Sequence, residues 1–241
     1  VTLLRRAVRR AGLVTTTSEP LRRLVVEDYG AHGTVVSLPS SVDKAVFHRR
    51  YRDGARDRLG LPRGVPLVGT AGGLYREKGI QPLYAAWEQV AARRPDVHLV
   101  LAGPVEAGLP RPEGDRVHYL GHLAHAQVAD LFGALDVGVI SVLDTAFGRY
   151  CFPQKAYEML ACGLPVVASD VGAMADLFAG LPQVLFRPGD ANALADALLR
   201  QLDRPTVPEV PIDDWAGLVA AVEPLLRDLA STREAAVSVA R

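Results

Sequence analysis

The chain of 241 residues has few lysines, two cysteines and no long apolar run. Only three of its 27 basic residues are lysine, Asn192 is its single asparagine, and isoleucine is nearly absent. This composition indicates a GC-rich coding background in which arginine is the default cation, so each retained lysine is a candidate for a specific role. No stretch approaches the ~20 apolar residues of a membrane-crossing helix, and we find no leader pattern of basic, apolar and small residues. We therefore expect a cytoplasmic location.

The two cysteines, Cys151 and Cys162, flank a predicted helix. A helical rise of about 1.5 Å per residue would hold them roughly 16 Å apart, which is too far for a disulfide. This spacing fits a reducing compartment.

The formal net charge is zero, so the overall charge does not favour nucleic acid or a membrane surface as a partner. One basic patch lies near the start of the chain, opposed by Glu19, and consists of Arg5, Arg6, Arg9, Arg10, Arg22 and Arg23. We interpret it as a solvated helix face, with a peripheral membrane contact as the alternative.

From Pro66 onward, short β-branched runs alternate with helical patterns. This alternation predicts an α/β fold with a Rossmann-like parallel sheet and helices on both faces. The expected strands are Leu67–Ala71, His98–Ala102, Val117–Leu120, Val137–Ser141, Pro165–Ser169 and Gln183–Phe186. The expected helices are Gly79–Arg94, Ala124–Leu135, Pro153–Ala161, Ala173–Ala179 and Ala191–Leu202.

The flanking parts of the chain have their own patterns. A basic helical stretch comes first, and strands Leu13–Thr17 and Thr34–Leu38 follow on either side of a helix at Glu19–Tyr29. A proline-bearing linker, Pro205–Pro211, leads into an amphipathic helix at Asp213–Leu229. We divide the chain into an N-terminal segment (1–45), a central domain (46–204), and a linker with a C-terminal helix (205–241).

Several expected strands end at glycines, namely Gly72 with Gly73, Gly103, Gly121 and Gly172. Because the carboxyl ends of parallel strands meet at one edge of the sheet, these turns should line a single ligand crevice. Glycine also serves tight turns that need a positive φ, so an empty cleft on a pure scaffold is the alternative.

The turn from Gly72 to Gly79 combines two glycines, a helix start and Lys78. Glycines let the backbone approach a ligand, and the helix amides, its dipole and the lysine favour a phosphate or diphosphate. The turn is not a P-loop, because glycine follows the lysine, and it does not fit the dinucleotide fingerprint. A charged helix start is the plain alternative.

A second candidate pair, Lys155 and Glu158, lies at i and i+3 on the helix expected from Pro153. Both side chains share one helix face, and the carboxylate could accept two vicinal hydroxyls such as those of a ribose. An ordinary surface ion pair is the alternative. The polar loop before this helix contains Asp144, Arg149 and Tyr150, and Arg149 is either a phosphate clamp or a solvated loop residue.

Metal ligation is not expected. The sequence lacks a D-x-D pair that would hold a divalent ion against a diphosphate. His118, His122 and His125 have a superficially metal-like spacing, but no neighbouring carboxylate completes the set, so we interpret them as structural or surface residues.

Together, these residues resemble the donor-binding half of GT-B glycosyltransferases, in particular family 4, the retaining enzymes related to glycogen and lipopolysaccharide glycosyltransferases. The resemblance runs from about Ala11 to Leu202. The segment 38–47 resembles P-N-G-V-D…F, with Ser40 and Ser41 in place of Asn-Gly, and the segment 72–79 resembles G-R-L-x-x-x-K-G. The segment 158–169, EMLACGLPVVAS, is close to E-x-x-A-x-G-x-P-V-V-A-S.

The resemblance implies that Lys78 binds the diphosphate and Glu158 the ribose of a nucleoside-diphosphate sugar. Gly73 replaces the family arginine, so Arg76 or Arg149 would have to supply its charge. Tyr150 stands where the family has its paired glutamate. The candidate catalytic residues are Asp144, Tyr150 and Lys155. The candidate donor-binding residues are Gly72, Gly73, Arg76, Lys78, Gly103, Gly121, Arg149 and Glu158.

The expected reaction is transfer of a hexose-like sugar to a hydroxyl acceptor with retention, without a metal ion or other cofactor. The nucleobase should contact backbone groups near Gly103 and Gly121. By the resemblance, a further N-terminal domain or a separate partner chain holds the acceptor, and we expect the chain to be a fragment. A non-catalytic nucleotide-sugar binding or assembly module is the alternative.

Overall fold

The structure is a computed structural model that describes residues 2–239. Its centre is a six-stranded, wholly parallel sheet with the strand order β5-β4-β3-β6-β7-β8. The strands are β3 (Leu67–Ala71), β4 (His98–Ala102), β5 (Val117–Tyr119), β6 (Val137–Ile140), β7 (Val166–Ser169) and β8 (Leu185–Phe186). The predicted α/β class and parallel sheet are confirmed.

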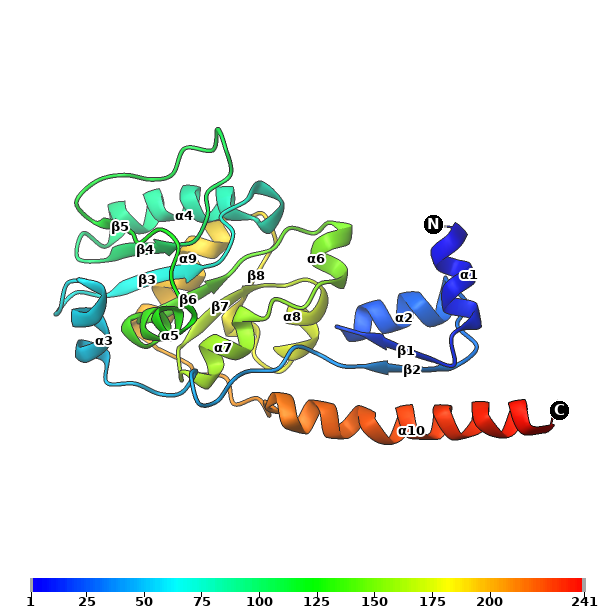
Figure 1. Cartoon of the computed structure of the whole chain (residues 1–241). Coiled ribbons are helices and arrows are strands. Elements are labelled where there is room, and N and C mark those ends of the chain that lie inside the picture. The colour runs from blue at the N-terminus through cyan, green and yellow to red at the C-terminus, as the bar shows by residue number, and fades with distance from the viewer. Residues whose placement is uncertain (1, 240–241) are drawn as a thin grey trace.

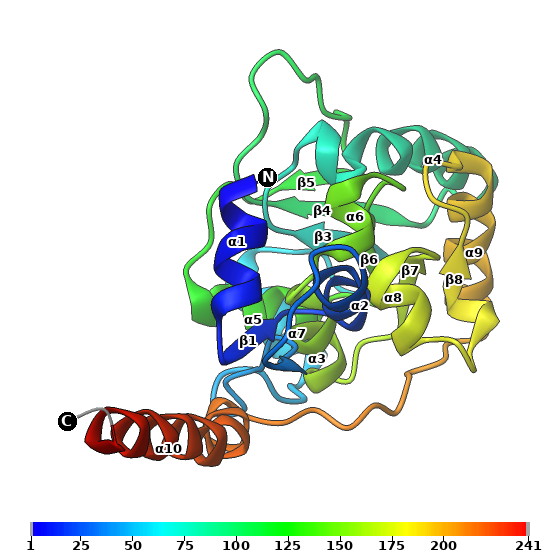
Figure 2. The same ribbon diagram turned by 90° about the vertical axis from the view of Figure 1, so that its right-hand side faces the viewer.

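Helices cover both faces of this sheet (Figures 1 and 2). One face packs against α4 (Ile80–Arg93) and α9 (Ala191–Asp203). The other face packs against α3 (Arg52–Leu59), α5 (His125–Ala134), α7 (Lys155–Ala161) and α8 (Gly172–Leu177). Since both faces are covered, the strands are almost continuously apolar, as expected for a buried parallel sheet.

Three local expectations need correction. The helix α3 was not predicted, because its sequence RDGARDRL is charged, contains Gly54 and buries only Ala55 and Arg56. The segment expected to be a loop after β6 contains the short helix α6 (Ala146–Tyr150), which is capped by the Thr145 hydroxyl. The helix expected from Pro153 begins at Lys155.

The N-terminal segment forms a small sheet of its own. Its elements are α1 (Thr2–Arg10), β1 (Leu13–Thr16), α2 (Glu19–Glu27) and β2 (Thr34–Ser37), and β1 pairs with β2 in parallel. The long helix α10 (Trp215–Val239) runs beside this segment (Figure 1), where the Leu229 side chain lies against Gly12.

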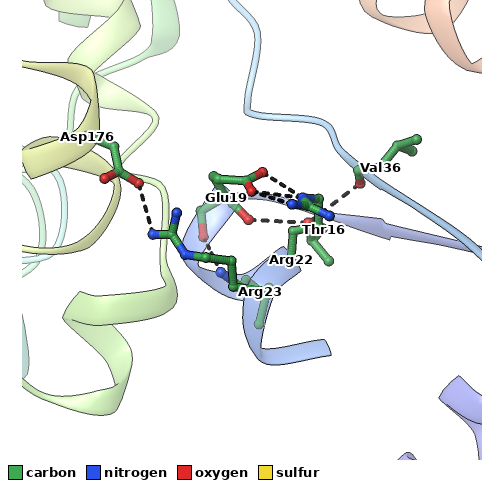
Figure 3. Close-up of polar contacts among 8 residues, drawn as sticks. Thr16, Glu19, Arg22, Arg23, Val36 and Asp176 are labelled. Carbon is green, nitrogen blue, oxygen red and sulfur yellow. Dashed lines mark hydrogen bonds and ion pairs between the residues drawn. The ribbon is translucent and has the colours of Figure 1, made fainter. Parts of the chain in front are cut away.

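Two polar contacts join the N-terminal segment to the central domain. The buried Ser18 hydroxyl donates a hydrogen bond to the carbonyl of Tyr150 at 2.8 Å. Figure 3 shows the second contact, the pair of Arg23 with Asp176 at 3.4 Å. A polar hollow of about 380 Å³ lies between α2, α6 and α8 at this junction. The end of α6 is therefore tied to the N-terminal segment through Tyr150.

Both cysteines are free, which confirms the expectation from their spacing. No helix in residues 2–239 is long and apolar enough to cross a membrane.

Candidate functional site

The strand order places one switch point in the sheet, between β3 and β6. From β3 the chain proceeds to β4 and β5 on one side, and β6, β7 and β8 follow on the other side. In open α/β sheets a crevice forms at such a point, outside the carboxyl ends of the two strands. The segments that leave these ends are the turn Gly72–Gly79 after β3 and the stretch 141–150 after β6. Most candidate residues from the sequence lie on these two segments.

The glycines after β3, β4 and β5 hold the strand ends together. The Gly72 amide donates to the Ala102 carbonyl at 3.0 Å, and the Gly103 amide donates to the Gly121 carbonyl at 2.7 Å. Gly103 has φ +120°, and a Cβ atom there would overlap the carbonyl oxygen of Gly72. The backbones approach so closely that only glycine fits at this position.

The backbone groups of Gly103, which we expected to contact a nucleobase, already have hydrogen-bond partners within the protein. The Gly103 amide is bonded to Gly121, and its carbonyl accepts the Tyr119 hydroxyl at 2.9 Å. A ligand would have to share these groups. Gly121 has φ +65° and open space where a side chain would stand.

Lys155 extends from the first turn of α7 to the switch point. Its Nζ donates to the Thr70 hydroxyl at 3.2 Å, and Thr70 in turn donates to the Val139 carbonyl on β6 at 2.8 Å. A Cβ atom at Gly72 would lie 3.6 Å from the Lys155 Nζ. The ammonium group therefore lies beside Gly72, at the start of the glycine turn.

The Lys155 side chain is partly buried, and its ammonium group has few partners in the fold. An ammonium has three donors, and among the described residues Lys155 has one hydrogen bond and no carboxylate within 4 Å. Burial, and secondly the neighbouring Lys78 ammonium, lower the pKa of Lys155 from 10.5 to about 8, while Glu158 opposes the change. Because a buried cation without an anion is unfavourable, the site is complementary to an anionic ligand.

Lys78 lies within the glycine turn, at the end of a 3-10 turn at Arg76–Lys78. Its Nζ lies 5.4 Å from the centre of the Tyr75 ring, and its carbonyl accepts the Ser141 hydroxyl at 3.2 Å. This hydrogen bond ties the turn to the end of β6. α4 begins directly afterwards, and Gly79 at its N-cap leaves the first helix amides without a side-chain cap.

Glu158 is half-buried, one helical turn beyond Lys155 on α7. Burial raises the pKa of Glu158, and His125, Lys155 and a hydrogen bond with Gln154 partly offset this rise. Ala156, Met159 and Leu160 are buried, as predicted, so Lys155 and Glu158 share the less buried face of the helix. Lys155 lies within electrostatic range of both Lys78 and Glu158.

The structure does not bring the candidate arginines to the two lysines as free cations. Arg76 forms an ion pair with Glu106 and donates to the Gly108 carbonyl at 3.3 Å. Arg149 forms two hydrogen bonds with Asp144, at 2.6 and 3.2 Å, and both side chains are exposed. Glu106 and Asp144 thus already neutralise the two arginines that were expected to replace the family arginine at position 73.

The space beside Gly73 is filled by the Tyr75 ring, so a larger residue there would displace it. The tyrosine at position 150 engages through its carbonyl with Ser18. Thr70 is a site residue that sequence reasoning missed. Its only signal is a hydroxyl within an apolar strand.

Two of the three histidines with metal-like spacing have partners within the fold. His118 Nε2 lies 2.9 Å from His98 Nδ1, and His125 packs edge-on against Phe47. Within residues 2–239, no group of three His, Cys, Asp or Glu side chains is arranged to hold a metal ion.

Comparisons with known proteins agree on one family for this chain. The model of the family described as glycosyl transferases group 1 matches residues 65–204. The chain is 32% identical to a D-inositol 3-phosphate glycosyltransferase from Stackebrandtia nassauensis over 77% of this chain and 45% of the relative. It is 30% identical to the enzyme of that name from Mycolicibacterium smegmatis over 93% of this chain and 48% of the relative. The chain thus spans about half the length of these curated relatives.

Solved structures of GT-B glycosyltransferases have the same fold. Sucrose-phosphate synthase from Thermosynechococcus elongatus superposes with a TM-score of 0.74 and 25% identity, covering 96% of this chain and 61% of that chain. The Anabaena protein HepE, solved in complex with UDP-glucose, superposes with a TM-score of 0.67 and 24% identity, covering 84% of this chain and 58% of that chain.

Proposed function

The chain belongs to the group 1 glycosyl transferase family, and we propose that it is the donor-binding part of a retaining GT-B glycosyltransferase of family 4. It would bind a nucleoside-diphosphate sugar and transfer a hexose-like sugar to a hydroxyl acceptor.

One observation carries this proposal: the Lys155 ammonium lies beside Gly72 in the turn that also carries Lys78, and it has no carboxylate partner within 4 Å among the described residues. A diphosphate placed at this turn would contact the ammonium groups of both Lys155 and Lys78. It would also face the uncapped amides at the start of α4. Lys155 would therefore supply the positive charge that is lost where Gly73 replaces the family arginine. Neither Arg76 nor Arg149 then has to leave its carboxylate partner.

The position of Glu158 supports a sugar or ribose contact. It lies one turn beyond Lys155, near His125 at the start of α5. A half-buried carboxylate at the edge of an anion site can accept hydrogen bonds from a pair of hydroxyls. Related proteins support this substrate class, since HepE was solved in complex with UDP-glucose and a relative from Corynebacterium glutamicum is named a GDP-mannose-dependent mannosyltransferase.

The chemistry of this site would be electrostatic. As the bond from the anomeric carbon to the diphosphate breaks, negative charge accumulates on the leaving oxygen. Fixed cations and amide dipoles that already face this oxygen stabilise the transition state more than the ground state. The two lysines provide this stabilisation, so the proposal requires no metal ion or other cofactor. Asp144 and Tyr150 lie on the segment after β6 and remain candidates for contacts with the reacting sugar.

The acceptor would be held outside the central domain, by a further domain or a separate partner chain. A cytoplasmic location is part of the same proposal, and a peripheral membrane contact through the basic residues of α1 is the alternative to a solvated helix face.

A non-catalytic nucleotide-sugar binding or assembly module is the second candidate. Tyr150 in place of an acid favours it, and so does the pairing of Asp144 with Arg149, which leaves that carboxylate without free charge. Transfer of a labelled UDP- or GDP-sugar by the full protein, in the presence of its acceptor, separates the two candidates.

Calorimetric titration of the chain with UDP, GDP and dTDP tests the binding site itself. We expect one of them to bind, with weaker binding in Lys78→Ala and unchanged binding in Lys44→Ala, because Lys44 is an exposed lysine outside the cleft. Failure of all three nucleotides to bind, or equal affinity in Lys78→Ala, would remove the proposed site.

A further inference from the structure

A second concentration of positive charge lies at the opposite edge of the sheet. A hollow of about 220 Å³ lies beside the residues that precede β6 and β7. Its lining contains three arginines and no carboxylate, and consists of Arg49, Arg50, Arg52, Phe132, Gly133, Leu135, Cys162, Gly163, Leu164 and Pro165.

The arginines around this hollow outnumber their acidic partners. Asp130 is shared by Arg50 and Arg58, with the closest contacts at 3.0 and 2.7 Å. Asp136 is shared by Arg52 and Arg56, at 2.6 and 2.8 Å. Each aspartate thus serves two guanidinium groups.

Arg49 adds a fifth guanidinium, which lies over Gly163 and has no hydrogen bond or ion pair among the described residues. The helices α5 and α7 end here, and each helix C-terminus carries about half a negative charge. Two carboxylates and two helix ends offset roughly three of the five positive charges, which leaves about two unbalanced.

Arg50, which lines the hollow, is held in position by the fold. Nε of Arg50 is buried and has no hydrogen-bond partner in the described part of the chain, although the other two nitrogens of this guanidinium bond to Asp130 and to the Val46 carbonyl. These two hydrogen bonds fix the guanidinium group of Arg50 beside the hollow that it lines.

We propose that this hollow binds a small oxyanion of the phosphate class. Guanidinium groups match the geometry of phosphate oxygens, and a phosphate carries about the charge that the cluster leaves unbalanced. Arg49 and Arg50 would contact the anion directly, while Arg52, Arg56 and Arg58 would maintain the surrounding positive charge.

This site is separate from the cleft that holds Lys78 and Lys155 and does not rest on the function proposed for that cleft. The two lie at opposite ends of strands of four or five residues, roughly 15 Å apart. The helix α7 connects them, since it begins at Lys155 and ends beside Gly163.

Calorimetry with inorganic phosphate and with pyrophosphate, at an ionic strength kept constant with chloride, tests the proposal. The protein used is the Lys78→Ala, Lys155→Met double variant, so that binding in the donor cleft does not contribute. We expect phosphate or pyrophosphate to bind this variant, and the addition of Arg49→Ala to weaken binding by roughly tenfold or more, as expected for loss of a charge-assisted contact. Arg49 is exposed and unpaired, so its replacement should leave the fold intact.

Two further variants make the test specific. Arg63→Ala is the matched control, because Arg63 pairs with Asp57 outside the hollow, and phosphate binding should be unchanged. Arg50→Lys keeps the charge but removes the planar guanidinium group and should weaken binding. Flotation with phosphatidic acid vesicles, compared with phosphatidylcholine vesicles, distinguishes a lipid phosphate from a free one. Absence of anion binding in the double variant, or binding that Arg49→Ala does not change, would overturn the proposal.

Discussion

Replacement of Lys155 by methionine should have opposite effects on stability and on ligand affinity. Methionine has a similar length and removes the buried charge. The free protein then no longer holds an ammonium group with a single neutral partner, Thr70. The protein with bound nucleotide, in contrast, loses a cation that contacts the diphosphate.

The magnitude of the stability effect follows from the pKa of Lys155. A change from 10.5 to about 8 corresponds to about 3 kcal/mol of unfavourable burial of the charged form. The lost hydrogen bond to Thr70 offsets about 1 kcal/mol, so the Lys155→Met variant should be more stable by about 2 kcal/mol. For a chain of this size, that is an increase of roughly 4 to 8 °C in melting temperature.

The stability difference should depend on pH. Below pH 8 the side chain is charged in both the folded and the unfolded chain, so the full cost of burial is present. Between about pH 8 and 10.5 the folded chain loses its proton first, and the stability of the wild type rises towards that of the variant.

Nucleotide affinity should change in the other direction. Removing one partner of a buried charged contact costs about 2 to 4 kcal/mol, which weakens binding roughly 30-fold to 1,000-fold. Thermal melting with and without UDP, GDP or dTDP, together with calorimetry, measures both effects on the same samples, and Lys44→Met is the control. A Lys155→Met variant that is less stable than wild type yet binds the nucleotide equally well would refute an anion-binding role for Lys155.

Three further predictions follow from the same contacts. Affinity of the wild type for the nucleotide should fall as pH rises above about 8, because the bound anion favours protonated Lys155, and calorimetry across this range should show no such fall in Lys155→Met. Glu158→Gln should weaken binding of a nucleoside diphosphate but leave that of pyrophosphate unchanged, and equal losses for both ligands would contradict a ribose contact. Gly103→Ala should destabilise the fold by about 2 kcal/mol or more, because the Cβ atom of the alanine would overlap the carbonyl oxygen of Gly72. Gly114→Ala, at the same φ but in open space, is the control, and equal melting temperatures for the two variants would contradict a steric cause.

Much of the fold could be predicted from the sequence because the sheet is parallel and covered on both faces. Such strands are short apolar runs bounded by glycine or proline, and all six of those in the central sheet agree with the structure to within two residues. The helix α3 could not be found in this way. It packs through Ala55 and the buried Arg56, whose guanidinium bonds to the Ala134 carbonyl and to Asp136, so its stability comes from distant partners.

The candidate site was predictable to a similar extent. The scarcity of lysine drew attention to Lys78 and Lys155, and the structure brings both to the glycine turn after β3. The ion pairs of Arg76 with Glu106 and of Arg149 with Asp144 were not predictable, because loop conformation decides which charges meet. The role of Thr70 was also hidden, since a threonine in a strand is typical of any sheet.

A crystal structure of the protein with UDP, or with whichever nucleotide binds in calorimetry, is the most direct test for an anion between Lys78 and Lys155. We expect a phosphate oxygen within about 3 Å of the Lys155 Nζ, Lys78 in contact with the same diphosphate, and Glu158 bonded to hydroxyls of the ligand. A nucleotide bound elsewhere, or one whose phosphates leave Lys155 without contact, would contradict the proposed site.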